Sequence, residues 1–191
     1  MPAETTTDGY LEGQLLIAMP TMGDERFERS VIYLCAHSAE GAMGIIVNKV
    51  LASMTFEELL AQLDIKAAEA VRQRAVHFGG PVDVGRGFVL HSAEVVREGT
   101  LVVQDGVAMT NTIDILREIA AGQGPRDCLL ALGYAGWGPG QLEGEIQQNA
   151  WLNVGADPTL LFDPDHASKW QRAIAKIGVD VSMLSGVAGR A

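Results

Sequence analysis

Apolar residues in this chain are grouped in short runs that are separated by glycine, proline and charged residues. The segment 13–19, "GQLLIAM", is almost continuously apolar and ends at Pro20, which is typical of a buried strand. Two further apolar runs, 30–37 and 41–48, are separated only by "SAE" at 38–40. A connection this short predicts that the two runs form an antiparallel hairpin.

Later segments also predict strands. The segment 75–82, "AVHFGGPV", predicts a strand that ends in a glycine turn, and 86–91, "RGFVLH", is the expected partner of that strand. Asp105-Gly106 stands between two β-rich pieces, which is a strong hairpin signal. The run 127–136, "DCLLALGYAG", has no polar alternation, so it is expected to be a central strand.

Helical periodicity follows a start signal at two places. Thr55 precedes Glu58 by three residues, which is the spacing of a capping box, and "FEELLAQL" then places its apolar side chains on one face. A second helix is expected to begin at Asn111 or Thr112 and to stop at Gly122.

A C-terminal helix is predicted from its boundary residues. Asp163 suits the N-cap, Pro164 the first helical position, and Gly178 the end of the helix. Hairpins combined with unevenly distributed helices predict a single α+β domain over 11–191, preceded by a flexible N-terminal tail at 1–10.

Composition limits the function more than it defines it. The chain has 191 residues, 48% of them hydrophobic, which fits a globular domain. No apolar run approaches the roughly 20 residues that span a bilayer, and the acidic start lacks a signal-peptide pattern, so we expect a cytoplasmic protein without membrane association. The net charge is −10, with 14 Lys and Arg against 24 Asp and Glu, so direct nucleic-acid binding is not expected.

The most motif-like stretch is the glycine-rich loop at 133–145, "GYAGWGPGQLEGE". A dinucleotide fingerprint that starts at Gly136 would need glycine or alanine where Gln141 stands. A Walker loop that starts at Gly133 would need lysine where Pro139 stands, and the two acids at 143 and 145 would repel phosphates. The loop is therefore predicted to turn the chain into a helix, and no cofactor is expected.

The two cysteines, Cys35 and Cys128, lie in apolar runs, which predicts reduced, buried thiols. An alternative is a small hydrolase or thiol-dependent enzyme: Cys35 and His37 are two positions apart on one predicted strand and would share a face, and His91 would join them if the strands are neighbours. The sequence contains no CxxC, HExxH or G-x-S-x-G motif, so no catalytic residue and no metal ligand is assigned.

Three stretches, 19–49, 77–92 and 131–152, together resemble the bacterial YqgE/AlgH family, over nearly the whole chain after the tail. The positions that carry the resemblance are Asp24, Phe27, Ser30, His37, Gly41, Gly44, Asn48, Gly79, Gly80, Pro81, Gly87, His91, Tyr134, Gly136, Trp137, Gln141, Glu143 and Trp151. The resemblance implies an α+β fold in which a bent, largely antiparallel, bifurcated sheet forms a pseudo-barrel with flanking helices. It also implies a role in the control of transcription by indirect means, because the family has no established biochemical activity and no recognisable DNA-binding helix pair.

We predict a non-enzymatic regulatory or binding module that recognises a small ligand or a protein partner, with its oligomeric state left open. Glycine turns expose backbone amides, aromatic rings offer flat amphipathic surface, and imidazole and amide groups supply directional hydrogen bonds. The hypothetical ligand-binding site comprises His37, Asn48, Gly79, Gly80, His91, Tyr134, Trp137 and Gln141.

Overall fold

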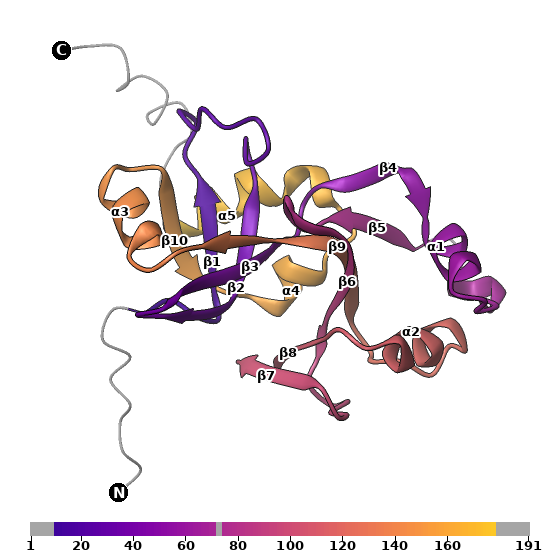
Figure 1. Cartoon of the computed structure of the whole chain (residues 1–191). Helices are drawn as coiled ribbons and strands as arrows, with labels where there is room; N and C mark the ends of the chain where they lie inside the picture. The colour runs from indigo at the N-terminus through magenta and orange to yellow at the C-terminus, as the bar shows by residue number, and fades with distance from the viewer. Residues whose placement is uncertain (1–9, 72–73, 179–191) are drawn as a thin grey trace, which may run out of the picture.

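A strongly curled sheet with helices on both sides forms the body of the protein (Figure 1). The computed structural model describes residues 10–71 and 74–178. Its strands are β1 (Gln14–Ala18), β2 (Val31–Ser38), β3 (Gly41–Ile46), β4 (Val50–Thr55), β5 (Ala75–Phe78), β6 (Val82–Ser92), β7 (Thr100–Gln104), β8 (Val107–Thr110), β9 (Cys128–Trp137) and β10 (Trp151–Gly155). The helices are α1 (Phe56–Gln62), α2 (Ile113–Ala120), α3 (Gln141–Gln147), α4 (Pro158–Phe162) and α5 (Lys169–Ile177), with short 3-10 helices η1 (Glu69–Val71) and η2 (His166–Ser168).

The sheet divides at the long strand β9. The main strand order is β10-β1-β2-β3-β9-β6-β8-β7. Strand β6 pairs along one edge of β9, whereas the other edge is shared: β5 pairs in parallel with residues 130–132, and β3 pairs antiparallel with residues 135–137. The predicted α+β fold with a bent, bifurcated and mainly antiparallel sheet is therefore confirmed.

Two glycines at the end of β5 make this division possible. The Gly79 N–H donates to the Leu132 carbonyl at 2.8 Å, and the Gly79 carbonyl accepts from the Ile46 N–H at 2.9 Å, so this residue links both branches. Gly80 has a φ of 153°, and a Cβ atom there would overlap the backbone of Tyr134. Only glycine lets the two strands approach this closely without strain.

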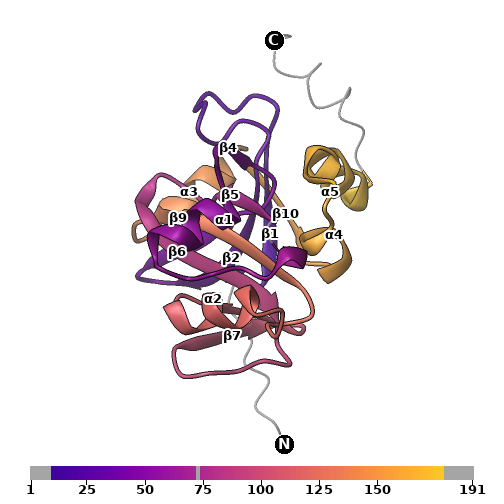
Figure 2. The same ribbon diagram turned by 90° about the vertical axis from the view of Figure 1, so that its right-hand side faces the viewer.

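Three apolar clusters hold the described residues together. One packs Tyr33 and Phe88 with Trp170 of α5, and a second lies on the opposite face of β1–β3, where Leu34 packs with Leu142 of α3. Figure 2 shows α4 and α5 on one side of the sheet and α3 on the other. The third cluster places α1 and α2 over β5, β6 and β9.

Most local predictions are confirmed. The hairpins β2–β3 and β7–β8, the central strand β9 and the helices α1 to α3 all form. Thr55 and Glu58 make both hydrogen bonds of the capping box. Residues 1–9 of the predicted tail lie outside the described residues, and Tyr10, its last residue, packs edge-on against His37.

The predicted pairing of 75–82 with 86–91 is wrong. Strand β6, which contains 86–91, pairs with β8 and β9, and β5 pairs instead with β4 and β9. Strand β4, "VLASMT", is mostly exposed and lacks the apolar pattern of a buried strand. Because no residue of β4 is fully buried, this segment has no alternation of buried and exposed positions that would mark it as a strand in the sequence.

The predicted start of the C-terminal helix is also wrong. Asp163 is the C-cap of the short helix α4, and its carboxylate accepts from the Asp165 N–H at 2.7 Å. The longer helix α5 starts only at Lys169, and the predicted end at Gly178 is confirmed. An Asp-Pro pair does open a helix nearby, at Asp157, which caps α4.

Candidate functional site

A groove on the curled sheet contains two of the predicted site residues, Tyr134 and Trp137. This Tyr134 groove has a volume of about 490 Å³ and is lined by Ala36, Ser38, Glu40, Gly41, Ala42, Met43, Arg86, Phe88, Met109, Asn111, Tyr134 and Trp137. The rings of Tyr134 and Phe88 meet edge-on at 5.7 Å, and the guanidinium of Arg86 lies 5.4 Å from the centre of the Phe88 ring. Buried Phe88 and Met109 and exposed Arg86 give the groove an apolar base and a polar rim.

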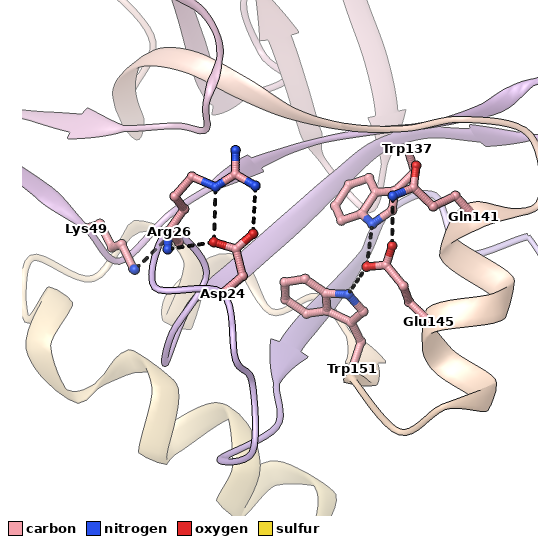
Figure 3. A network of polar contacts seen from close by, with 7 residues as sticks. All are labelled: Asp24, Arg26, Lys49, Trp137, Gln141, Glu145 and Trp151. Carbon is pink, nitrogen blue, oxygen red and sulfur yellow. Dashed lines mark hydrogen bonds and ion pairs between the residues drawn. The ribbon is translucent and has the colours of Figure 1, made fainter.

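The glycine-rich loop is held by the carboxylate of Glu145 on α3 (Figure 3). Glu145 Oε1 accepts from the indole N–H of Trp137 at 3.3 Å and from that of Trp151 at 3.1 Å. Glu145 Oε2 accepts from the Gln141 amide at 3.0 Å, and the Gln141 oxygen accepts from the Gly138 N–H at 3.0 Å. The polar groups of Gln141 and the indole of Trp137 are therefore used within the loop itself.

The second cluster in Figure 3 holds the loop between β1 and β2. The Asp24 carboxylate accepts from Arg26 Nε at 3.0 Å and from Arg26 Nη2 at 2.7 Å, and Lys49 Nζ donates to the Arg26 carbonyl at 3.1 Å. The Arg26 hydrogen bond lowers the pKa of Asp24. These exposed contacts give Asp24, one of the positions that carry the family resemblance, a structural role.

His37 does not share a face with Cys35, contrary to the expectation from strict alternation. The pairing of β2 with β3 shifts between Leu34 and Ala36, which leaves Cys35 as the extra residue of a β-bulge. Ala36 lines the Tyr134 groove, whereas His37 points to the α3 side, where it bonds Glu143. His37 Nδ1 accepts from the Leu11 N–H at 3.0 Å, so the proton lies on Nε2 and is donated to the Glu143 carboxylate.

Asn48 and His91 lie apart from the groove, and each has backbone or hydroxyl partners of its own. Asn48 accepts from the Val31 N–H at 2.9 Å and donates to the Arg29 carbonyl at 2.8 Å, which fixes the start of β2. His91 is fully buried, donates from Nδ1 to the Ser92 carbonyl at 2.9 Å and accepts at Nε2 from the Thr110 hydroxyl at 2.7 Å. Within the described residues, no hydrogen bond joins His91 or His37 to Cys35.

A second cavity, which sequence reasoning missed, lies where β5 and β9 meet α1, α2 and the segment between α4 and α5. This histidine cleft has a volume of about 370 Å³ and is lined by Phe56, Arg74, Ala75, His77, Ile119, Cys128, Leu129, Leu130, Phe162, Pro164 and His166. His77 Nε2 lies 3.3 Å from His166 Nδ1, and their rings meet edge-on with centres 4.3 Å apart. Arg74 Nη1 lies 2.8 Å from the Cys128 sulfur.

Both imidazoles of the cleft are held neutral at physiological pH. Burial, together with the neighbouring His166, lowers the pKa of His77 to about 3. Burial and the positive charge of Lys169 lower the pKa of His166 to about 4. Lys169 is itself fully buried, donates to the carbonyls of Val47 and Leu161 at 3.1 and 2.8 Å, and has its pKa lowered by burial to about 8.

The two thiols have different surroundings. Burial raises the pKa of Cys35 to about 12, and its Sγ contacts only the Tyr33 carbonyl at 3.8 Å among the described hydrogen-bond partners. Burial also raises the pKa of the half-buried Cys128, although the Arg74 guanidinium opposes that shift. Neither environment favours the thiolate that nucleophilic catalysis requires.

Over the ranges 10–71 and 74–178, no three His, Cys, Asp or Glu side chains are arranged to hold a metal ion. In the same part of the chain, every helix is too short or too polar to cross a membrane.

Comparison with known proteins identifies the family. The family model DUF179, described as AlgH-like, matches residues 15–182. The chain is 58% identical to UPF0301 protein blr1492 from Bradyrhizobium diazoefficiens, a match that covers 100% of this chain and 92% of that protein. The chain belongs to the AlgH-like family.

Other relatives agree with this assignment. This AlgH-like chain is 56% identical to UPF0301 protein M446_6268 from a Methylobacterium species, covering 100% of this chain and 94% of that protein. The solution structure of the AlgH protein from Pseudomonas aeruginosa matches with a TM-score of 0.80 at 40% identity, covering 98% of this chain and 100% of that one. Protein DIP2367 from Corynebacterium diphtheriae, with a TM-score of 0.73 at 21% identity over 92% of this chain and 91% of its own, shares the fold. The names of these relatives specify no reaction or ligand.

The predicted ligand site is only partly assembled in this AlgH-like fold. Gly79 and Gly80 pack against the backbone beside Tyr134, and Tyr134 and Trp137 line one groove. The Gly79 amide pairs with β9, so it is not free for an anion. The histidine cleft gave no signal along the sequence because His77 and His166 are 89 positions apart and stand in no metal-binding or catalytic motif.

Proposed function

We propose that this chain is a non-enzymatic binding module whose Tyr134 groove takes an apolar segment of a protein partner. The observation that carries the proposal is the composition of the groove. Methionine and aromatic side chains form its base, and the Arg86 guanidinium stands at its exposed rim. Flexible thioethers and flat rings bordered by a cation are typical of surfaces that receive apolar anchors of another chain.

The groove is less suited to catalysis. None of its lining residues in the described part of the chain is a cysteine or a histidine. Besides Tyr134 and Trp137, its polar side chains are those of Arg86, Asn111, Glu40 and Ser38, all four of them exposed. The Ser38 hydroxyl accepts from the Glu40 backbone N–H, and among the described residues no hydrogen bond joins it to a side-chain base, as the nucleophile and base pair of a hydrolase would require.

Selection from a random peptide library displayed on phage tests this function. Wild type is expected to enrich peptides with apolar or aromatic anchors. Met43→Lys places a charge in the groove and should abolish the enrichment, whereas Met54→Lys, at a half-buried methionine on β4, should retain it. Arg86→Gln should weaken the enriched peptides several-fold. Equal enrichment by both lysine variants, or no enrichment by wild type, would overturn the proposal.

We also propose that any effect on transcription is indirect. The chain has only 14 Lys and Arg to neutralise phosphates, against 24 Asp and Glu that repel them, and its net charge is −10. Binding to generic duplex DNA should therefore be undetectable at micromolar protein concentration and physiological salt. A fluorescence anisotropy titration with labelled duplex measures this directly. Tight binding that weakens steeply with added salt would show direct DNA binding instead.

A further inference from the structure

In the histidine cleft, one imidazole nitrogen, His166 Nε2, has no hydrogen-bond partner among the described residues. The chain has four histidines, and in His37, His77 and His91 both ring nitrogens have hydrogen-bond partners. His166 uses Nδ1 toward His77, and its Nε2 has no hydrogen-bond partner among the described residues. His166 is half-buried and lines the cleft, so this nitrogen belongs to a side chain that a ligand can reach.

The protonation of that nitrogen follows from a chain of hydrogen bonds. His77 Nδ1 lies 3.1 Å from the Leu130 carbonyl, which can only accept, so the proton of neutral His77 is on Nδ1. His77 Nε2 then accepts, and His166 Nδ1 must donate to it across 3.3 Å. Neutral His166 therefore carries a lone pair on Nε2, which can accept a hydrogen bond from a donor group of a ligand.

Two cations lie in or next to the same cleft of an otherwise acidic chain: Arg74 lines it, and Lys169 is close to His166. The exposed guanidinium of Arg74 has only the Cys128 sulfur as a hydrogen-bond partner among the described residues. Lys169 adds a buried ammonium close enough to perturb His166. The acids nearest His166 have partners of their own, since Asp163 pairs with Arg172 at 3.0 Å and Asp165 accepts from the Ser168 hydroxyl at 2.8 Å. Two further acids, Asp127 and Glu94, act on Cys128.

The remaining walls are apolar. Phe56 of α1, Ile119 of α2 and Phe162 of α4 contribute side chains from three separate helices. A volume of about 370 Å³ lies within the range of small-molecule sites, in which apolar walls and a few convergent polar groups are the usual arrangement.

We propose that the histidine cleft binds a small organic acid that also carries a hydroxyl or N–H donor. The carboxylate pairs with Arg74, the donor bonds to His166 Nε2, and the apolar body packs against Phe56, Ile119 and Phe162. A guanidinium is well suited to a carboxylate because its N–H groups match the two oxygens. This site is separate from the Tyr134 groove and does not depend on the function proposed there.

A metal ion fits this cleft less well. Cys128 also lines the cleft, but no three His, Cys, Asp or Glu side chains of the described residues are arranged there to hold a metal ion. The buried ammonium of Lys169 also opposes a second positive charge.

Three probes separate the two polar contacts. The first is 4-hydroxyphenylacetate, which has both groups; phenylacetate lacks the donor, and 4-hydroxyphenylacetamide lacks the charge. A parallel set based on 2-hydroxyisocaproate, isocaproate and 2-hydroxyisocaproamide changes the shape of the apolar body. Binding is measured by calorimetry, with histidine side-chain NMR signals as a second readout. We expect at least one hydroxy acid to bind most tightly and to shift the His166 and His77 signals.

Variants then assign the contacts. Arg74→Gln should weaken the hydroxy acid about tenfold or more and leave the amide unchanged, as expected for a charge-assisted pair. His166→Phe should remove the advantage of the hydroxyl over the parent acid. Arg86→Gln, in the other cavity, is the matched control and should bind the probes as wild type does. Circular dichroism confirms that each variant is folded.

The proposal is overturned if neither hydroxy acid binds at millimolar concentration, or if acid and amide bind equally well. It is also overturned if Arg74→Gln and Arg86→Gln behave alike. None of these results bears on the peptide selection at the Tyr134 groove, so the two proposals fail independently.

Discussion

The two ends of strand β9 use polar side chains in opposite ways. At its C-terminal end, Glu145 accepts from Trp137, Trp151 and Gln141, so the groups of the glycine-rich loop are saturated with one another. At its N-terminal end, Arg74 and His166 line a cavity, and the described residues leave part of their hydrogen-bonding capacity unused. Saturated networks fix a fold, whereas unsaturated groups that face a cavity are available to a ligand. The stretch that looks most like a motif is thus the structural one.

The largest effect should follow from breaking the saturated network. Glu145→Ala leaves two buried indole N–H groups without an acceptor and should lower the free energy of unfolding by about 2–4 kcal/mol. Urea denaturation measures the change. Glu145→Gln retains an acceptor oxygen and should lose clearly less. A loss below about 0.5 kcal/mol for the alanine variant would show that the network contributes little.

Acid should weaken the other end of β9. The pKa of His77 is lowered from 6.5 to about 3, so only the unfolded chain takes up this proton as the pH falls below 6.5. Stability from this group is therefore complete above pH 6.5 and declines below it, by about 1 kcal/mol between pH 7 and 5.5. The groups that face His77 and His166 are Lys169, Asp163 and Asp165.

A comparison of variants isolates that contribution. His77→Asn retains a donor toward the Leu130 carbonyl but does not titrate, so its stability should change less over the same pH interval. Urea denaturation at several pH values gives both slopes. Identical slopes for the two proteins would mean that His77 takes up its proton equally in the folded and unfolded states.

The thiol at the N-terminal end of β9, Cys128, should also be more reactive than Cys35 on β2. Iodoacetamide at pH 8 should label half-buried Cys128 slowly, whereas Cys35 should remain unlabelled until the protein is unfolded. Peptide mass spectrometry resolves the two sites. Rapid labelling of Cys35 in the folded protein would instead support the thiol-dependent enzyme predicted as the alternative.

The smallest effect is expected for Arg74. Because its side chain is exposed and its described hydrogen bond is to sulfur, Arg74→Gln should change the free energy of unfolding by less than about 0.5 kcal/mol. The same urea experiment measures it beside Glu145→Ala. If the two variants were equally destabilised, Arg74 would be a structural residue and the contrast between the two ends of β9 would disappear.

The sequence by itself determined the elements whose causes are local. The Thr55 and Glu58 capping box, the Asp105-Gly106 turn and the short β2–β3 connection act within a few residues, so each was predictable. The family resemblance supplied the bent, bifurcated sheet. The site was less accessible, because only Tyr134 and Trp137 of the eight predicted residues line the groove.

Tertiary structure decided which side chains meet. One extra residue at Cys35 turned His37 away from the thiol, because a bulge reverses the alternation of every later side chain on the strand. The parallel pairing of β5 with β9 brought His77 beside the segment after α4, and so beside His166. Such encounters depend on strand pairing and helix packing across the whole chain, which no local pattern specifies.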